Sequence, residues 1–300
     1  MARVLLIGNP VAARHDPAVA ETVVRIFRAA GWVVDFRTTA GPVDARRFAA
    51  EAVADGVDVV AVFGGDGTTM QAAAALVGTE TVLGLVPGGT GNLLAGNLRV
   101  PTGPVQAAEL IIRGQPRRID LGRIERADGI HYFGVACGAG ADARVMGNTQ
   151  IADKRRLGIG GYFGAFFREL PLIRTSRFRV TVDDRPIDRE ASVCMVLNCG
   201  EIIPPFVRAV REAAPDDGVF DVLVLAADSP WQVLRGMTRA LANVVLQTGP
   251  TPYLIHARGT VVTIETERPE PVQYDGDLAG LTPLTAVMQP GAIRVVAPIR

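Results

Sequence analysis

Residues 57–68 read VDVVAVFGGDGT, and residues 82–92 read VLGLVPGGTGN. In both segments a short apolar run with the length of a buried strand ends in a glycine-rich turn, and a helix-like stretch follows. In an open α/β sheet, ligands bind beyond the carboxyl ends of the strands, where such turns lie. One such turn alone is equally typical of a tight turn with Asp66 or Thr68 as a helix cap. The two together predict one concave rim lined with backbone N–H donors.

The N-terminal part of the chain alternates strand and helix on both sides of these turns. Its apolar runs of strand length cover residues 4–7, 32–36, 57–63 and 82–86. The helix-like stretches cover residues 17–30, 43–54, 68–77 and 104–113. This alternation implies right-handed crossovers and a parallel sheet covered on both faces. We therefore expect a Rossmann-like α/β nucleotide-binding domain over residues 1–123.

Beyond residue 120 the pattern changes to closely spaced strand-like segments. These cover residues 117–125, 130–137, 177–182, 187–199, 219–225, 260–266 and 272–274. Two helix-like exceptions cover residues 154–170 and 231–246. Many strands at this spacing predict an antiparallel sheet or sandwich. We expect a β-sandwich domain over residues 124–300.

The composition excludes several classes of protein. Lysine plus arginine total 31 and aspartate plus glutamate total 31, whereas a nucleic-acid-binding protein needs a basic stripe. A hydrophobic fraction of 48% excludes disorder as the main state. No run approaches the ~18 apolar residues of a transmembrane helix. The three cysteines, Cys137, Cys194 and Cys199, leave one unpaired in any disulfide scheme and lack metal-ligand spacing, so we expect a reducing, cytoplasmic compartment.

Both turns have the chemistry of a phosphate site. Glycines let backbone N–H groups approach phosphate oxygens, and a helix N-terminus adds partial positive charge. Asp66 would repel a bare phosphate, but with a divalent cation between them it would hold that metal directly or through water. The expected nucleotide-binding residues of the two turns are Gly64, Gly65, Gly67, Thr68, Gly88, Gly89, Thr90 and Asn92.

A third candidate follows the first predicted strand, where residues 9–13 read NPVAA. The Asn9 side chain, with Pro10 after it, could contact ribose or phosphate, although Asn-Pro is also a common turn. Two familiar nucleotide motifs are absent. The chain has no Gly-x-x-x-x-Gly-Lys-Ser/Thr, and Lys154 is its single lysine, so a P-loop NTPase is excluded. The G-x-G-x-x-G fingerprint does not follow the first strand, which argues against a Rossmann dehydrogenase.

Together, GGDGT at residues 64–68, GTGN at residues 89–92, Asn9-Pro10 upstream and DGD at residues 275–277 resemble the catalytic family of diacylglycerol kinases. This family includes bacterial lipid kinases, sphingosine kinases and ceramide kinases, and it is distantly related to NAD kinases. The resemblance covers essentially the whole chain. It implies a nucleotide-binding domain and a β-sandwich with the active cleft between them, and the last ~15 residues are expected to pack back on the first domain.

The resemblance also implies ATP as the phosphoryl donor, Mg²⁺ as the cofactor and diacylglycerol as the acceptor that yields phosphatidic acid. Phosphoryl transfer needs held phosphates, neutralised charge and a deprotonated acceptor hydroxyl. By resemblance Asp275 is the general base for that hydroxyl, and Asp66 is the second catalytic acid. Thr39 corresponds by position to a nucleotide-contacting threonine, with Thr38 nearly as good a candidate. Asp277 stands where the family usually has glutamate, and its supporting role stays open.

Residues 216–218, DDG, resemble a structural Mg²⁺ motif of bacterial lipid kinases. The resemblance assigns the Asp217 carboxylate and the backbone carbonyls of Ala214 and Val219 as ligands. An ordinary turn is an equal alternative, because Asp-Asp-Gly between two strands needs no metal.

Three positions depart from the family pattern and leave alternatives open. Met70 and Gln71 replace a common Asn-Glu pair, and Leu93 replaces a common aspartate. One alternative is a NAD kinase, which shares GGDGT but would carry Asn-Glu beyond the second turn, where Asn92 is followed by Leu93. The other is a nucleotide- or lipid-binding protein of the same fold that no longer catalyses.

Residues 153–167 join a basic start, DKRR, to an apolar and aromatic run. Such a segment could border the entry of a lipid acceptor from an anionic membrane surface, although it is more often a core-packing helix with a charged start. We therefore expect a lipid substrate at a membrane surface, with the protein peripheral at the inner membrane face. The sequence leaves a homodimer open.

Overall fold

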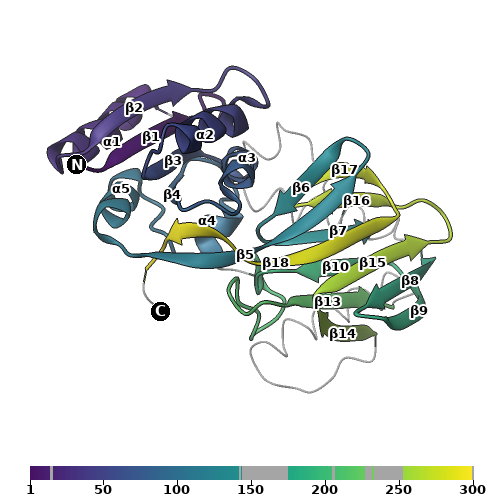
Figure 1. Ribbon diagram of the computed structural model, residues 1–300. Coiled ribbons are helices and arrows are strands. Elements are labelled where there is room, and N and C mark those ends of the chain that lie inside the picture. The colour runs from purple at the N-terminus through teal and green to yellow at the C-terminus, as the bar shows by residue number, and fades with distance from the viewer. Residues whose placement is uncertain are drawn as a thin grey trace. The chain divides into compact units, whose positions relative to one another are not determined.

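A computed structural model of the chain describes residues 1–13, 16–141, 143, 175–204, 207–226, 232 and 253–298. The chain forms two compact units. The first consists of Met1–Asp120 with Gly291–Arg300, and the second of Leu121–Pro290. Figure 1 shows the labelled helices in the first unit, whereas the second unit carries the later strands. The predicted fold class, an α/β domain with a parallel sheet followed by a β-sandwich, is confirmed.

A parallel sheet forms the centre of the first unit. Its strands lie in the order β2 (Val33–Thr38), β1 (Arg3–Gly8), β3 (Val59–Gly64) and β4 (Val82–Pro87). The end of β18 (Leu284–Val296) adds a parallel strand beside β4, where Arg294 pairs with Val82. Every residue of β3 and β4 is buried, which is typical of parallel strands covered on both faces.

Helices of the first unit pack in two pairs. One pair is α1 (Pro17–Ala29) with α5 (Pro104–Arg113), and the other is α2 (Asp44–Ala54) with α3 (Asp66–Leu76). A short helix, α4 (Leu93–Asn97), follows the second glycine turn.

Helix α1 shows why these segments are helical. The Asp16 side chain accepts a hydrogen bond from the N–H of Ala18 at 2.8 Å, and Pro17 stands at the first helical position, where its missing N–H costs nothing. The buried side chains of α1 recur at a spacing that places them on one face of the helix. They are Ala20, Val23, Val24 and Phe27.

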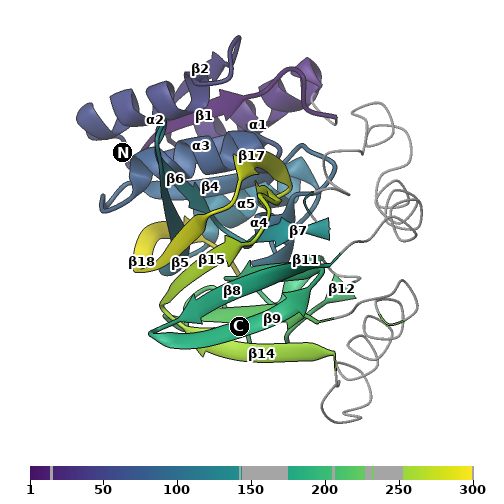
Figure 2. The ribbon, with the colours of Figure 1, turned by 90° about the vertical axis from the view of Figure 1, so that its right-hand side faces the viewer.

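Two antiparallel sheets build the second unit. The first has the strand order β14 (Leu254–Gly259), β13 (Phe220–Leu225), β10 (Val193–Leu197), β7 (Ala136–Gly140), β16 (Pro271–Tyr274) and β17 (Asp277–Leu281). In the second, the early part of β18 is followed by β15 (Val261–Thr266), β8 (Ser176–Val182) and β9 (Arg185–Ala191). Figure 2 shows β8 and β9 side by side as a hairpin.

Four shorter or bridging strands complete the fold. β5 (Pro116–Arg126) pairs with β18 and with β6 (Gly129–Phe133), and β11 (Glu201–Ile203) pairs with β12 (Val207–Arg208). The chain leaves the first unit along β5 and returns to it along β18. At the return, the N–H of Gly291 donates to the buried carboxylate of Asp120 at 2.7 Å.

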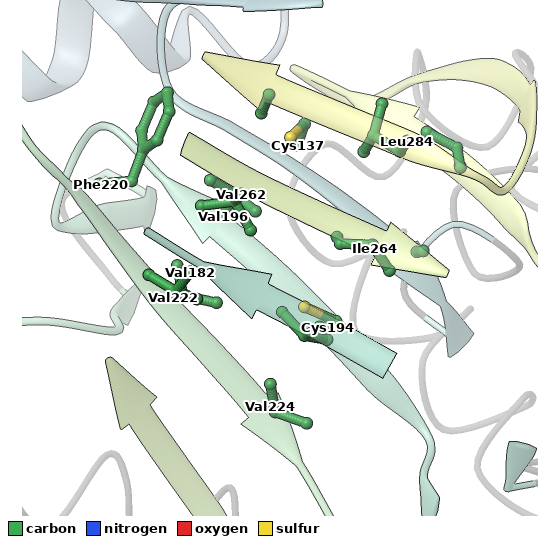
Figure 3. Packing of buried hydrophobic residues seen from close by; sticks show 14 of the residues in the cluster. Cys137, Val182, Cys194, Val196, Phe220, Val222, Val224, Val262, Ile264 and Leu284 are labelled. Atoms are coloured by element: carbon green, nitrogen blue, oxygen red, sulfur yellow. The ribbon is translucent and has the colours of Figure 1, made fainter. Parts of the chain in front are cut away.

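The hydrophobic core of the second unit is made by side chains from strands of both sheets. Figure 3 shows Cys137, Cys194 and Val196 from the first sheet packed with Val262 and Ile264 from the second. The buried rings of Phe133, the last residue of β6, and Phe220, the first residue of β13, stack with centroids 5.6 Å apart. Removing this apolar surface from water is the main favourable term in forming the sandwich.

Two strand predictions need correction. The single strand predicted over residues 130–137 is two strands, β6 and β7, because the N–H groups of Gly134 and Val135 donate to a side chain of another element. The strand predicted over residues 187–199 is likewise divided into β9 and β10. The N–H of Ser192, between them, donates to the carbonyl of Leu225.

The predicted helix over residues 154–170 and the lipid-entry segment over residues 153–167 lie outside the described residues. The predicted helix over residues 231–246 does so as well, apart from position 232. Within the described ranges, no helix combines the length and the apolar character needed to cross a bilayer.

Candidate active site

The first-unit residues selected from the sequence lie at one edge of the parallel sheet. Because β2, β1, β3 and β4 are parallel neighbours, their carboxyl ends meet at that edge. Thr39 directly follows β2, Asn9-Pro10 follows β1, and the two glycine turns follow β3 and β4. The sheet therefore brings together the segments that sequence reasoning predicted to bind one ligand.

The two glycine turns touch through their backbones. The N–H of Gly88 donates to the carbonyl of Gly64 at 2.9 Å. A Cβ atom added to Gly89 would lie 2.6 Å from the Cα atom of Gly65, a distance that real Cβ atoms essentially never show. Glycine is therefore required at position 89 by the packing of one turn on the other.

Asp66 is the first residue of α3, and its carboxylate connects the two turns. Its Oδ1 atom accepts hydrogen bonds from the N–H of Leu93 at 2.6 Å and the N–H of Leu94 at 3.4 Å. Both donors lie in the first turn of α4, where unpaired N–H groups and the helix dipole favour negative charge. Asp66 thus holds the start of α4 against the turn after β3.

Asn92 shapes the second turn from within. It has a left-handed backbone with φ of 48°, which asparagine tolerates better than most residues. Its Oδ1 atom accepts from the N–H of Gly89 at 2.9 Å, and its Nδ2 atom donates to the carbonyl of Gly89 at 2.8 Å. Asn92 therefore fixes the conformation of the turn from Gly89 to Gly91.

Asn9 joins the first strand to the first glycine turn. Its Nδ2 atom donates to Oγ1 of Thr68 at 2.7 Å, and its N–H donates to the carbonyl of Phe63 at 3.0 Å. Thr68 is buried, whereas Pro10 and Gly67 are exposed. The side chains of Asn9 and Thr68 thus fasten one loop to the next.

A small pocket lies beneath the turns. Its volume is about 10 Å³, and its polar lining side chains are Asp66, Thr69 and Asn92. This space holds roughly one water molecule. A nucleotide would have to lie over the turns and not within this pocket.

Asp275 lies in the tight turn between β16 and β17, in the second unit. The φ angles of Asp275 and Gly276 are 47° and 88°, both in the left-handed region that an Asp-Gly turn supplies. The carboxylate of Asp275 accepts three hydrogen bonds from successive backbone N–H groups. They come from Gly134 at 2.7 Å, Val135 at 2.8 Å and Ala136 at 3.1 Å. We call residues 134–136 the cradle.

Burial raises the pKa of Asp275 to about 6, even though the three N–H donors of the cradle lower it. The neighbouring carboxylate of Asp277, which is exposed at the start of β17, adds a smaller increase to the same pKa. Asp275 is therefore ionised above about pH 6 and protonated below it. This is the range in which a carboxylate can act as a general base near neutral pH.

Comparison with known proteins identifies the family. Residues 3–124 match the diacylglycerol kinase catalytic domain, and residues 135–297 match the YegS C-terminal NAD kinase beta sandwich-like domain. A protein of Mycobacterium tuberculosis named diacylglycerol kinase is 33% identical over 267 residues, which are 85% of this chain and 82% of that one. The chain belongs to the diacylglycerol kinase family. It is a kinase.

Further relatives of this kinase agree. A protein of Xanthomonas campestris pv. campestris named "Probable lipid kinase YegS-like" is 30% identical over 85% of this chain and 83% of its own length. A solved structure from Bacillus anthracis str. Sterne, 26% identical, superposes with a TM-score of 0.80 and covers 99% of this chain and 95% of that one. A diacylglycerol kinase structure from the same organism has a TM-score of 0.77 at 23% identity and supports the fold alone.

The predicted structural-metal residues of this kinase are arranged around an arginine. Oδ2 of Asp217 lies 2.5 Å from Nη2 of Arg258, and Oδ1 accepts from the N–H of Val219 at 3.2 Å. The Ala214 carbonyl accepts from the N–H of Asp217 at 3.3 Å. Burial raises the pKa of Asp217, whereas the charge of Arg258 lowers it. A magnesium ion at Asp217 stays a prediction, and it would have to displace this guanidinium.

Arg258 also lies close to a second carboxylate, that of Asp221. Nε of Arg258 lies 3.3 Å from Oδ1 of Asp221, whose side chain is 2% exposed. Nε2 of His256 lies 2.6 Å from the same oxygen. Among the described residues, no group of three or more His, Cys, Asp and Glu side chains is placed to hold a metal ion.

Several polar contacts escaped sequence reasoning. Nδ1 of His131 lies 3.0 Å from the Tyr274 hydroxyl, and its Nε2 lies 3.0 Å from Asp128. Asn198, which is buried, donates from Nδ2 to the carbonyl of Gly134 in the cradle at 2.8 Å. The contacts of Asn198 with Gly134 and of His131 with Tyr274 could not be predicted, because each joins residues that lie far apart in the chain.

The arginine contacts predict how the second unit responds to magnesium. We expect Arg258→Gln to lower the melting temperature, because the buried carboxylate of Asp221 loses a charged partner. Added Mg²⁺ should then raise the melting temperature of this variant by a few degrees more than that of the wild type, because two carboxylates are left without the guanidinium. Arg177→Gln, which breaks the exposed pair with Asp188, is the matched control. Equal responses to Mg²⁺ in all three proteins would contradict this expectation.

Proposed function

We propose that this kinase transfers the γ-phosphoryl group of ATP to the hydroxyl of diacylglycerol, giving phosphatidic acid. The observation that carries the proposal is the carboxylate of Asp275, which is held by three backbone N–H groups and has a pKa of about 6. Such a group can accept a proton from a substrate hydroxyl near neutral pH. The name of the M. tuberculosis relative, diacylglycerol kinase, supports this choice of acceptor.

We assign the nucleotide to the carboxyl edge of the parallel sheet. The backbone N–H groups of Gly65, Gly67 and Thr90 and the N-terminus of α3 are the donors proposed for its phosphates. Mg²⁺ bound with the nucleotide would neutralise charge on the triphosphate. The fit to the donors is mixed, because Asp66 offers a carboxylate whose Oδ1 atom already accepts two N–H groups of α4. Asp66 is proposed to serve the metal directly or through water while it keeps the turns together.

The proposed reaction gives Asp275 one task, which is to take the proton of the acceptor hydroxyl. As the O–H bond breaks, the oxygen forms a bond to the γ-phosphorus, and the bond from that phosphorus to the β-phosphate oxygen breaks. The products are ADP and the phosphorylated lipid, and the proton resides on Asp275. Activity should therefore rise with pH through the pKa of Asp275, about 6, because only the ionised carboxylate can accept the proton.

We place this activity at the cytoplasmic face of a membrane, where the acceptor is available. Diacylglycerol has two acyl chains and remains in the bilayer, so the enzyme must act peripherally at the lipid surface. The turn that carries Asp275 is flanked by β17, whose Leu278 is 55% exposed and whose Leu281 is 51% exposed. These apolar side chains in the second unit are compatible with a lipid acceptor.

The acceptor is tested by labelled phosphoryl transfer. We expect the wild type, given γ-labelled ATP and Mg²⁺, to label diacylglycerol in mixed micelles in preference to sphingosine, ceramide, phosphatidylglycerol or NAD. Asp275→Asn should lower kcat by ~10² or more while leaving ATP affinity within a few-fold, since loss of a general base has this magnitude. Labelled NAD would redirect the assignment to a NAD kinase. Absence of label on every acceptor would favour a binding protein that does not catalyse.

Asp66 has two proposed tasks, and two substitutions separate them. Asp66→Asn keeps an oxygen that can accept from α4 but removes the charge, so we expect a near-normal melting temperature and a loss of Mg²⁺-dependent turnover of ~10-fold or more. Asp66→Ala removes both and should also lower the melting temperature, by loss of the helix-capping contact. Asp44→Asn is the control, because Asp44, the first residue of α2, likewise accepts two backbone N–H groups, those of Ala40 and Gly41. Full turnover by Asp66→Asn would limit Asp66 to a role in holding the turns.

A further inference from the structure

Asn198 is a buried polar residue that the proposed reaction does not use. It directly follows β10 and is 1% exposed. Its Nδ2 atom donates to the carbonyl of Gly134 at 2.8 Å, and its backbone N–H donates to the carbonyl of Val135 at 2.8 Å. The N–H of Cys199 donates to the same Val135 carbonyl at 3.1 Å. Both carbonyl acceptors belong to the cradle.

Two peptide groups of the cradle therefore connect Asn198 to Asp275. The peptide between Gly134 and Val135 accepts the Asn198 side chain at its oxygen and donates its N–H to Asp275. The peptide between Val135 and Ala136 accepts the Asn198 backbone at its oxygen and likewise donates to Asp275. Hydrogen bonds that run through a peptide group polarise it and strengthen one another. The hydrogen bonds from Asn198 thus orient the N–H groups of Val135 and Ala136 and strengthen their bonds to Asp275.

The cradle needs such an anchor because it lies between two strands. β6 ends at Phe133 and β7 begins at Ala136, so Gly134 and Val135 have no place in either strand. Val135 is 2% exposed, so the polar backbone groups of this segment depend on hydrogen-bond partners within the protein. Without the Asn198 side chain, the Gly134 carbonyl would keep only the thiol of Cys199 as a donor, at 3.3 Å, and a thiol is a weak donor. The peptide between Gly134 and Val135 would then be held less firmly, and its N–H group would be less well directed at Asp275.

We propose that Asn198 is a positioning residue for the general base, because it fixes the peptide groups that hold the Asp275 carboxylate. This inference rests on the proposed function of Asp275 as the base. Hydrogen bonds to a carboxylate favour its charged form, and their loss raises its pKa. Removing the Asn198 amide should therefore move the acidic limb of the activity profile to higher pH.

The test is the pH profile of kcat for Asn198→Ala and Asn198→Ser. We expect the midpoint of the acidic limb to rise by about 1 pH unit in Asn198→Ala, so that turnover falls ~10-fold on the acidic side and recovers at high pH. Asn198→Ser keeps a hydroxyl donor and should shift less. The control is Ser192→Ala, because the buried Ser192 also donates from its side chain to a backbone carbonyl, that of Leu225. It should alter stability without moving the midpoint.

A second readout needs no activity and covers a variant that loses turnover. With ¹³C-labelled aspartate, the Asp275 carboxyl signal, assigned by its absence in Asp275→Asn, should titrate at higher pH in the folded Asn198 variants than in the wild type. An unchanged titration midpoint and an unchanged pH profile would overturn the positioning role. Full turnover by Asp275→Asn would instead defeat the proposed function, and the carboxyl titration would still decide whether Asn198 positions that side chain.

Discussion

The contact between the backbones of two glycine turns is the constraint on which the first unit depends. Gly65 and Gly89 approach so closely that a single added carbon on Gly89 would lie 2.6 Å from its neighbour. Because β3 and β4 are adjacent and parallel, the turns that follow them must pass each other at the same edge. Glycine has no side chain, so the two turns can pass at this short distance. The lack of side chains also lets a phosphate approach the backbone N–H groups.

Both units use backbone N–H groups to hold a carboxylate from a distant segment. Asp66 accepts the first N–H groups of α4, and Asp275 accepts three successive N–H groups of the cradle. In each case the donors lie where regular pairing is absent, at a helix start or between two strands. In both units, these backbone N–H groups stabilise the negative charge of the carboxylate. A carboxylate held this way keeps its position and can still exchange a proton or serve a cation.

Local patterns predicted the parallel strands, their helices and both glycine turns, because the apolar periodicity and the glycine runs that indicate them lie within short segments of the chain. The single strand predicted over residues 130–137 was wrong. Two N–H groups within it donate to the carboxylate of Asp275, which lies 141 positions beyond Gly134, and a local sequence pattern cannot show such a contact. The pairing of Asp217 with Arg258 depends on β13 lying beside β14, a strand that the sequence pattern did not indicate. Asn198 carries no motif, and its importance follows only from the peptide carbonyls that it meets.

In the proposed reaction, the glycine turns bind the nucleotide and Asp275 takes the proton of the acceptor hydroxyl. The most direct test is paramagnetic relaxation of the ¹³C-labelled Asp275 carboxyl by Mn²⁺ bound with a non-hydrolysable ATP analogue, compared with Mn²⁺ alone to correct for binding elsewhere. We predict strong broadening of the Asp275 signal only when nucleotide is present, and weaker broadening in Asp66→Asn. An Asp275 signal that stays sharp in the nucleotide complex, while the first-unit signals broaden, would contradict the account.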